Sequence, residues 1–382
     1  MCVSGTPDEV STTRRMIPAM IVAGVVGLVL GYGVLLLVNA GIALMWETIP
    51  ETWESTPAWY VFGVLLTAAA LVYVVRRFIG DDGHSPLGGI KISSLSPRQY
   101  LGAILAILVS LFGGAVLGPE VALVATGSVV GGLAAKWMKC TDAKSVKSIV
   151  GIGALGAIMA LFVGPVLAGS LSLGGSPSSI EFDDLGWAIL VAVIATIAIS
   201  VARLIGFLIA RAAGTGPHLR ILIGAALVIG SVAILMEYMT GERAIFVVTS
   251  GEELITDLPT LTSISTVVAI IAFKSIAYAL SLGAGFRGGP FFPAMFVGAA
   301  AGLLISLILP NGPGVYSAMT VGVVASVIAT APMKWPIAIA LGIVIGFAMG
   351  GWTLIPSAVV GAVVARAVPR WGDRIKLVDH SG

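Results

Sequence analysis

Residues 274–302 read KSIAYALSLGAGFRGGPFFPAMFVGAAAG, in which a Gly/Pro-rich stretch separates two apolar runs. Proline cannot continue a preceding helix, because it lacks a backbone N–H and its ring clashes with the turn before it. At membrane depth, backbone that is not helical survives only where protein or a water-filled cavity covers it. The stretch therefore predicts two membrane helices separated by a break.

The composition of the whole chain fits a membrane protein. Only 10% of its 382 residues are charged and 58% are hydrophobic, whereas a soluble domain carries about 25% charged residues. The mean hydropathy is +1.05. A spanning helix needs about 20 apolar residues, and charge-free stretches of that length cover 17–45, 99–119, 148–180, 288–333 and 335–365. We predict an all-α polytopic membrane protein.

The apolar runs and their interruptions predict the order of the helices and two membrane halves. Helices are expected near 16–45, 59–77, 98–115, 119–137, 147–174, 185–211, 219–238, 262–282, 291–309, 314–330, 335–349 and 354–368. Residues 239–261 are more polar and predict an external or interfacial excursion. We expect a cytoplasmic segment over 1–15, a first membrane half over 16–211, a second over 212–368 and a short tail over 369–382.

Charged and aromatic residues predict the orientation of the first helices. Arg14 and Arg15 precede the first apolar run, which indicates a cytoplasmic N-terminus by the positive-inside rule. The next loop is then external, with Trp46, Trp53 and Trp59 as expected interfacial anchors. We expect a multi-pass protein of the cell membrane, in direct contact with the lipid bilayer.

Other classes of partner find no support in the residues. The formal net charge is only +2, so nothing argues for nucleic acid. His84, His218 and His380 lie far apart in the chain, and we expect neither a histidine-based metal site nor a cofactor.

Glycine and proline cluster at three points, 80–86, 118–120 and 283–293, and each cluster stands directly before a new apolar run. The two deepest clusters, near 118 and 289, fall in opposite halves of the chain. Breaks at corresponding places in two halves point to an inverted-repeat transporter fold with its site at the midplane.

A helix that starts at such a break can hold an anion. Its N-terminus carries about half a positive charge and several unpaired N–H donors. Pro119 suits the first turn of a helix, and Glu120 is the only acid between residues 83 and 141. A carboxylate there can fold back onto the same N–H groups and compete with an anion, so we favour Glu120 as a gate. The alternative is a carboxylate that only complements the helix dipole.

Three cations near the breaks have open roles. Lys274 precedes the second break and Lys334 lies in a Pro-flanked turn, and for both an electrostatic role stands beside a snorkelling or paired structural one. For Arg287, inside the glycine-rich loop, we favour the electrostatic role.

With these residues in view, the chain resembles the CLC family of chloride channels and proton-coupled chloride antiporters. The stretch 274–302 is similar to the family segment that ends in G-x-F-x-P, here at 289–293. Residues 118–122 are similar to G-[KR]-E-G-P, and Thr330-Ala331-Pro332 to R-A-P. The resemblance runs from about residue 20 to 368.

The resemblance implies a homodimer with a separate pore in each subunit and many tilted helices. It gives Glu120 the role of gating residue. It implies that chloride or a similar monovalent anion is held by helix ends and backbone amides, for which the matching positions are Gly83, Ser85, Gly118, Val121, Ala122, Gly289, Phe291 and Phe292.

The chain departs from the family at the pore hydroxyls and at the amides. Alignment on Pro86 puts Gly83 at the position of the family's pore serine, although Ser85 could serve if the loop shifts. No tyrosine follows Tyr316, so the family's pore tyrosine is expected to be lost. Pro290 has no N–H to donate. Pro119 replaces a cation, which lowers the positive potential at the mouth.

A further departure concerns protons. In the family's antiporters an inner glutamate follows a pattern that corresponds to 164–176 here, where Gly175 and Ser176 replace the acids. We therefore predict weak or absent proton coupling, with Asp183 or Asp184 as the candidate substitutes.

Four functions remain open, and passive, Glu120-gated transport of a monovalent anion is our leading hypothesis. The second is proton-coupled antiport. The third is an intramembrane enzyme, for which only His84-Ser85 offers reactive groups and no matching acid is placed beside them. The fourth is a membrane scaffold that no longer transports.

Overall fold

The computed structural model describes residues 7–81, 85–89, 92, 95–168, 182–214, 216–309, 311–331 and 333–368. This part of the chain forms twelve α-helices: α1 (Pro7–Ala43), α2 (Ala58–Val74), α3 (Pro97–Phe112), α4 (Glu120–Trp137), α5 (Ala143–Ala168), α6 (Phe182–Ala213), α7 (Leu219–Thr240), α8 (Ile264–Gly283), α9 (Phe291–Ile308), α10 (Val315–Thr330), α11 (Trp335–Gly350) and α12 (Ile355–Ala367). The predicted all-α membrane fold is confirmed, and the described residues contain 8 helices long and apolar enough to cross a membrane.

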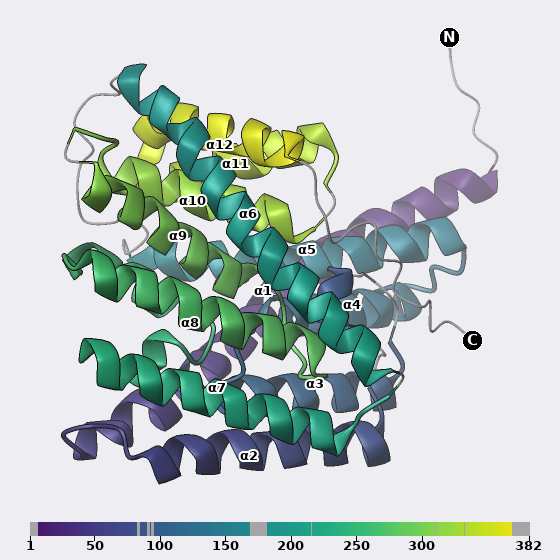
Figure 1. Ribbon diagram of the computed structural model, residues 1–382. Helices are drawn as coiled ribbons and strands as arrows, with labels where there is room; N and C mark the ends of the chain where they lie inside the picture. Colours follow the sequence, from purple (N-terminus) through teal and green to yellow (C-terminus); the bar gives the residue numbers. More distant parts are fainter. Residues whose placement is uncertain are drawn as a thin grey trace.

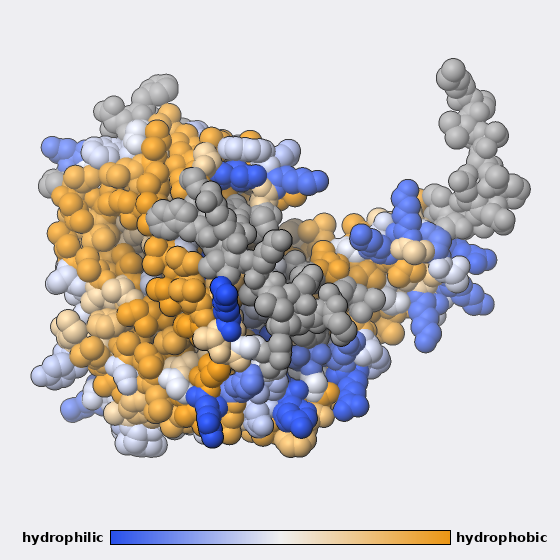
Figure 2. Space-filling view, turned by 45° about the vertical axis from the view of Figure 1, so that its right-hand side comes forward, coloured by the Kyte–Doolittle hydropathy of each residue, from blue (hydrophilic) through white to orange (hydrophobic). Residues whose placement is uncertain are grey.

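The helices lie in layers that place distant parts of the chain side by side. Helices α2, α7, α8 and α9 follow one another from the bottom of the view upward, and α6 runs diagonally from the upper left toward the lower right, packed against α8, α9 and α10 (Figure 1). Helix α1 packs against α4 and α5, and its first turns extend away from the rest of the molecule. A broad apolar surface covers the left half of the space-filling view, while most strongly hydrophilic side chains gather to its right and along its lower edge (Figure 2).

Small residues allow the helices to approach closely, as expected of membrane helices. Gly127 of α4 faces Gly153 of α5, and Gly298 of α9 faces Gly322 of α10. At each of these positions an added Cβ would collide with the backbone of the facing helix. The glycines inside the apolar runs therefore act in packing.

Two breaks interrupt the helical backbone within the core. The first connects α3 to α4 through residues 113–119, and the second connects α8 to α9 through residues 284–290. Pro119 and Pro290 are the N-cap residues of α4 and α9. Pro119 therefore stands one position before the first turn in which the sequence placed it. The capping position makes no use of a backbone N–H, so proline fits there too.

The polar segment before α8 folds over one end of the core. It contains the short 3-10 helices Ala244–Phe246, Glu253–Ile255 and Leu258–Thr260. The backbone N–H of Thr249 donates to the carbonyl of Gly114 at 3.2 Å, which ties this segment to the first break.

Candidate functional site

The two breaks meet in the core of the molecule. Gly118 and Gly289 form an isolated antiparallel bridge in which each backbone N–H donates to the other's carbonyl at 2.7 Å. Because these glycines stand just before α4 and α9, the bridge brings the N-termini of two helices from opposite halves of the chain to one point. Several unpaired N–H groups and two positive dipole ends converge there.

A carboxylate occupies this point. Glu120, the first residue of α4, is only 2% exposed. Its Oε1 accepts a hydrogen bond of 2.5 Å from the backbone N–H of Phe291, the first residue of α9. The N–H groups of Phe292 and of Glu120 itself also act on this carboxylate, whereas its Oε2 has no hydrogen-bond partner in the described part of the chain. The side chain thus places a negative group where an anion would meet both helix ends.

The glycines of the bridge provide the space for this carboxylate. A Cβ added to Gly289 would collide with the Glu120 carboxyl group, and a Cβ added to Gly118 would collide with the same group and approach the Phe292 ring. Larger residues at either position are therefore incompatible with the observed position of Glu120.

Val121 and Ala122, the other predicted ligands of α4, follow Glu120 in the first turn of the helix. Val121 is 7% exposed and Ala122 is fully buried. Their N–H groups belong to the first turn, where a helix leaves its donors without partners in the helix. The structure thus groups Gly118, Val121 and Ala122 with Gly289, Phe291 and Phe292 around Glu120.

The expected serine loop is only partly described. Gly83 lies outside the described residues, as do Gly175 and Ser176, and the side chains of Asp183 and Asp184 are not described either. Ser85 is half-buried, and no hydrogen bond joins it to Glu120 or Phe291 among the described residues. The turn Pro86–Gly88 that follows it packs against α6 and α8.

Arg203 of α6 holds this turn and was not singled out from the sequence. Its guanidinium is buried and donates to the carbonyl of Leu87 at 3.4 Å and to the carbonyl of Thr330 at the end of α10. It also lies over the Phe207 ring, 5.5 Å from the centroid. The sequence could have identified Arg203, because an arginine inside an apolar membrane helix requires buried partners for its charge.

Tyr278 of α8 is a second residue that the sequence did not point to. It is fully buried, and its hydroxyl donates to the carbonyl of Pro290 at 2.6 Å. The charges that act on this hydroxyl are those of Arg203 and Glu120. A phenol thus reaches the second break from the preceding helix, in a chain that has no tyrosine after Tyr316.

Arg287, for which we favoured an electrostatic role, forms an ion pair at the second break. Its Nη2 lies 2.5 Å from Asp81 Oδ2, and Arg76 Nε lies 2.7 Å from the same oxygen. Arg76 also donates to the carbonyl of Gly285 at 2.8 Å. Burial alone would raise the pKa of Asp81, but the charges of Arg287 and Arg76 outweigh it, so the pKa lies below its usual range. This cluster joins the loop after α2 to the second break.

Lys274 does not snorkel to the surface, and no carboxylate of the described residues pairs with it. The side chain is fully buried, and Nζ donates to the carbonyls of Phe246, Val248 and Thr249 at 3.1–3.4 Å. It also lies over the Phe296 ring at 4.4 Å. Lys274 therefore holds the polar segment against α9. Lys334, by contrast, is exposed at the N-cap of α11.

A small polar cavity of about 20 Å³ lies under the polar segment, with Asn39, Glu47, Ser250 and Glu252 in its lining. A space of this size holds about one water molecule. Burial, with the nearby charges of Glu120 and Glu253, raises the pKa of Glu252 to about 8. An acid of the polar segment therefore lies near enough to Glu120 for the two charges to interact.

Comparisons with known proteins agree with this fold. A family model described as voltage gated chloride channel matches residues 173–370. The putative ion-transport protein YfeO of Escherichia coli is 23% identical over 310 residues, which cover 71% of this chain and 74% of the relative. Its counterpart in Escherichia fergusonii is 23% identical over 313 residues, with the same two shares.

Three solved structures share the fold. A slow cyanobacterial Cl⁻/H⁺ antiporter has a TM-score of 0.71 at 16% identity and covers 92% of this chain and 93% of its own. A CLC-type fluoride/proton antiporter has a TM-score of 0.61 at 14% identity, and the match covers 96% of this chain and 97% of the antiporter. A eukaryotic CLC transporter has a TM-score of 0.62 at 15% identity, and the match covers 95% of this chain and 72% of the transporter.

Proposed function

Because this chain belongs to the voltage gated chloride channel (CLC) family, as a divergent member, we propose that Glu120 gates a passive pore for chloride or a similar monovalent anion. The observation that carries the proposal is the hydrogen bond from the Phe291 N–H to the Glu120 carboxylate at the point where α4 and α9 begin. A carboxylate in that place excludes another anion. When it is protonated or swings away, the same N–H groups are free to bind one.

A site built from helix N-termini can bind an anion and also release it. A conduit needs a site that binds an ion strongly enough to admit it and weakly enough to release it. The nearby cations support this reading, because Arg287 is paired with Asp81 and Lys274 with backbone carbonyls. The proposed ligands are the backbone groups of Gly118, Val121, Ala122, Gly289, Phe291 and Phe292, with Gly83 or Ser85 on the other side of the ion.

The passive mode rests on the sequence. Gly175 and Ser176 stand where an inner acid would relay protons toward Glu120. Without such an acid, anion movement is not tied to proton movement in a fixed ratio. Proton-coupled antiport is the second candidate, favoured by the fact that two of the similar folds are a Cl⁻/H⁺ and a fluoride/proton antiporter.

The proposed assembly is a homodimer in the cell membrane, with one pore in each subunit and a cytoplasmic N-terminus. The support is the resemblance to the family and the position of Arg14 and Arg15 before the first apolar run.

Anion efflux from liposomes tests the gate. We expect Glu120→Ala to raise the rate, and both Glu120→Ala and Glu120→Gln to remove the part of the pH dependence that comes from Glu120 itself. Glu51→Gln, a change at an exposed acid of the external turn, is the matched control and should behave as the wild type. If both Glu120 variants keep the wild-type rate and pH dependence, Glu120 is not the gate.

Two further measurements separate the competing functions. A chloride gradient that drives proton uptake in a fixed ratio would establish antiport and contradict the passive mode. Absence of both anion flux and anion binding in the purified protein would identify a scaffold. A series of chloride, bromide, nitrate and fluoride in the same efflux assay defines the transported anion.

A further inference from the structure

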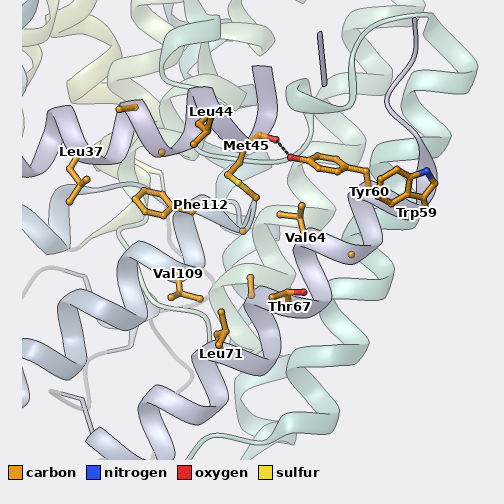
Figure 3. Close-up of a pocket in the computed structure, with 15 residues that line it drawn as sticks. Leu37, Leu44, Met45, Trp59, Tyr60, Val64, Thr67, Leu71, Val109 and Phe112 are labelled. Atoms are coloured by element: carbon orange, nitrogen blue, oxygen red, sulfur yellow. Dashed lines mark hydrogen bonds between the residues drawn. The ribbon is translucent and has the colours of Figure 1, made fainter. Parts of the chain in front are cut away.

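A groove of about 780 Å³ lies between α1, α2 and α3. Leu37 and Phe112 lie on one side of it and Val64 and Thr67 on the other, with Met45 between them (Figure 3). Apart from Thr67 and two aromatic residues at one end, the lining side chains are apolar.

The groove opens onto the surface that faces the bilayer. Helices α1 and α2 both belong to segments long and apolar enough to span a membrane. Leu37 is 52% and Leu71 is 46% exposed along the groove. At one end Trp59 lies beside Trp53, with ring centroids 5.7 Å apart. Tryptophans gather at the level of the lipid headgroups, so the groove runs from that level into the apolar layer.

An acyl chain is the occupant that fits this place. A buried water needs two to four polar partners, and the Tyr60 hydroxyl at the end of the groove already donates to the carbonyl of Met45 at 2.6 Å. The volume lies within the range of about 300–1,000 Å³ that is usual for ligand sites. Because the groove is continuous with the lipid-facing surface, the apolar molecule that meets it is a phospholipid tail.

The floor of the groove is also the start of the first break. Phe112 and Gly113 end α3, and the Trp46 indole donates to the carbonyl of Phe112 at 3.0 Å. The same indole packs so closely on Gly114 that a Cβ there would collide with it. Trp46 lies in a π-helical turn, Leu44–Thr48, whose first two residues line the groove. Such turns are frequent at functional sites.

We propose that this groove binds one acyl chain of a phospholipid from the leaflet on the Trp59 side, and that the bound chain steadies residues 113–119 and thereby Glu120. The binding itself is independent of the proposed gate, whereas its effect on transport rests on that gate. The two parts can therefore fail separately.

A glycine inside the groove allows the space to be filled without a clash. Gly63 of α2 lines the groove, and a Cβ added to it would meet nothing within 4 Å. Gly63→Phe and the milder Gly63→Leu should occupy the place of the chain. Leucine also favours a helix over glycine, so Gly63→Leu leaves α2 intact. Gly33 of α1 is equally open but does not line the groove, and Gly33→Phe and Gly33→Leu are the matched controls.

The test uses full-length protein in liposomes that contain a phosphatidylcholine with a photoreactive diazirine in one acyl chain. We expect crosslinks concentrated on peptides of α1, α2 and α3 that line the groove, and a loss of at least fivefold in both Gly63 variants but not in the Gly33 variants. Equal crosslinking in all five proteins, or crosslinks spread evenly over the lipid-facing helices, would overturn the binding site.

Two further readouts complete the test. In the Gly63 variants the rate of anion efflux should differ from that of the wild type, and the Glu120→Ala background should remove the difference. An unchanged rate with reduced crosslinking would overturn the link to Glu120. Covalent dimers formed through Gly63→Cys, but not through Gly33→Cys, would show that a second copy of the chain fills the groove and would overturn the lipid assignment.

Discussion

Glu120 of α4 and Phe291 of α9 lie 171 positions apart in the chain and are joined by a hydrogen bond of 2.5 Å from the Phe291 N–H to Glu120 Oε1. The bond crosses from one broken helix to the other, so the carboxylate does more than complement the dipole of its own helix. It is held by donors of both helices, and displacing it exposes all of them at once.

The first prediction concerns the space that Gly289 leaves for the carboxylate. All three atoms nearest to a Cβ at this position belong to Glu120, and the backbone of Gly289 does not have a positive φ. Gly289→Ala should therefore push the carboxylate out of the site. Overpacking of this kind costs about 1–3 kcal/mol, and 1.4 kcal/mol corresponds to about tenfold, so we expect efflux to rise by about tenfold.

The Glu120→Ala background supplies the control for this effect. With the carboxylate absent, Gly289→Ala has nothing to displace and should leave the rate unchanged, which is a strongly non-additive pair. Gly132→Ala in α4, where a Cβ meets nothing within 4 Å, should be silent. Additive effects in the double variant would contradict the mechanism.

The second prediction concerns Tyr278, which fixes the backbone just before α9. Tyr278→Phe removes the hydrogen bond to the Pro290 carbonyl and should cost about 1 kcal/mol. We expect a several-fold weaker binding of chloride, measured by calorimetry in the Glu120→Ala background. Tyr316→Phe in α10 is the control. Unchanged affinity would show that the Tyr278 hydroxyl does not position the anion site.

The third prediction concerns the Arg76–Asp81–Arg287 cluster. Asp81→Asn leaves two arginines facing each other without their anion, and removing one partner of a buried pair costs on the order of 3 kcal/mol. The pKa of Asp81 is lowered by the two arginines, against the effect of burial. The stabilisation of the fold by ionised Asp81 is therefore present at neutral pH. It is lost as the pH falls through the pKa that Asp81 has in the folded protein.

Thermal unfolding in detergent between pH 7 and pH 3 measures this effect. The wild type should lose stability toward low pH more steeply than Asp81→Asn. Asp142→Asn is the control, because the pKa of Asp142 is lowered by hydrogen bonds from Ser145 at an exposed site. If the stability of the wild type and of Asp81→Asn changes equally with pH, Asp81 is not the source of the pH dependence.

The fourth prediction concerns Glu252 near the polar cavity. Because burial and the charges of Glu120 and Glu253 raise the pKa of Glu252 to about 8, this group is mainly neutral at pH 7 and ionised at pH 9. If the separation is taken as about 10 Å, a unit charge costs an anion about 0.4 kcal/mol in a water-like medium, which is about twofold. In the Glu120→Gln background the charge of Glu120 is absent, but burial, which is the largest cause, and the charge of Glu253 still raise the pKa of Glu252, so efflux should fall by up to about twofold between pH 7 and pH 9.

Replacement of the titrating group should abolish this fall. Glu120→Gln/Glu252→Gln should give the same rate at both pH values, whereas Glu120→Gln/Glu51→Gln should keep the decline. A decline that survives Glu252→Gln would assign it to another group.

The helices and their breaks were predictable because the signals are local. A charge-free run must match the thickness of the bilayer, and proline or paired glycines interrupt a helix at their own position. All twelve expected helices are present, although their ends shift by several residues, as at α1 and α5. Trp46 was misplaced, since it is buried at 3% exposure against Gly114 rather than anchored at the interface.

The sequence by itself determined that Glu120 starts a helix at a break and that a second break precedes Phe291. Only the tertiary structure decided that Gly118 and Gly289 pair, that Arg287 meets Asp81 across 206 positions, and that Lys274 and Tyr278 are buried against backbone carbonyls. The physical reason is that a charge or hydroxyl in an apolar interior must find a partner. The residue type shows that a partner is required, but only the packing of the helices determines which group becomes that partner.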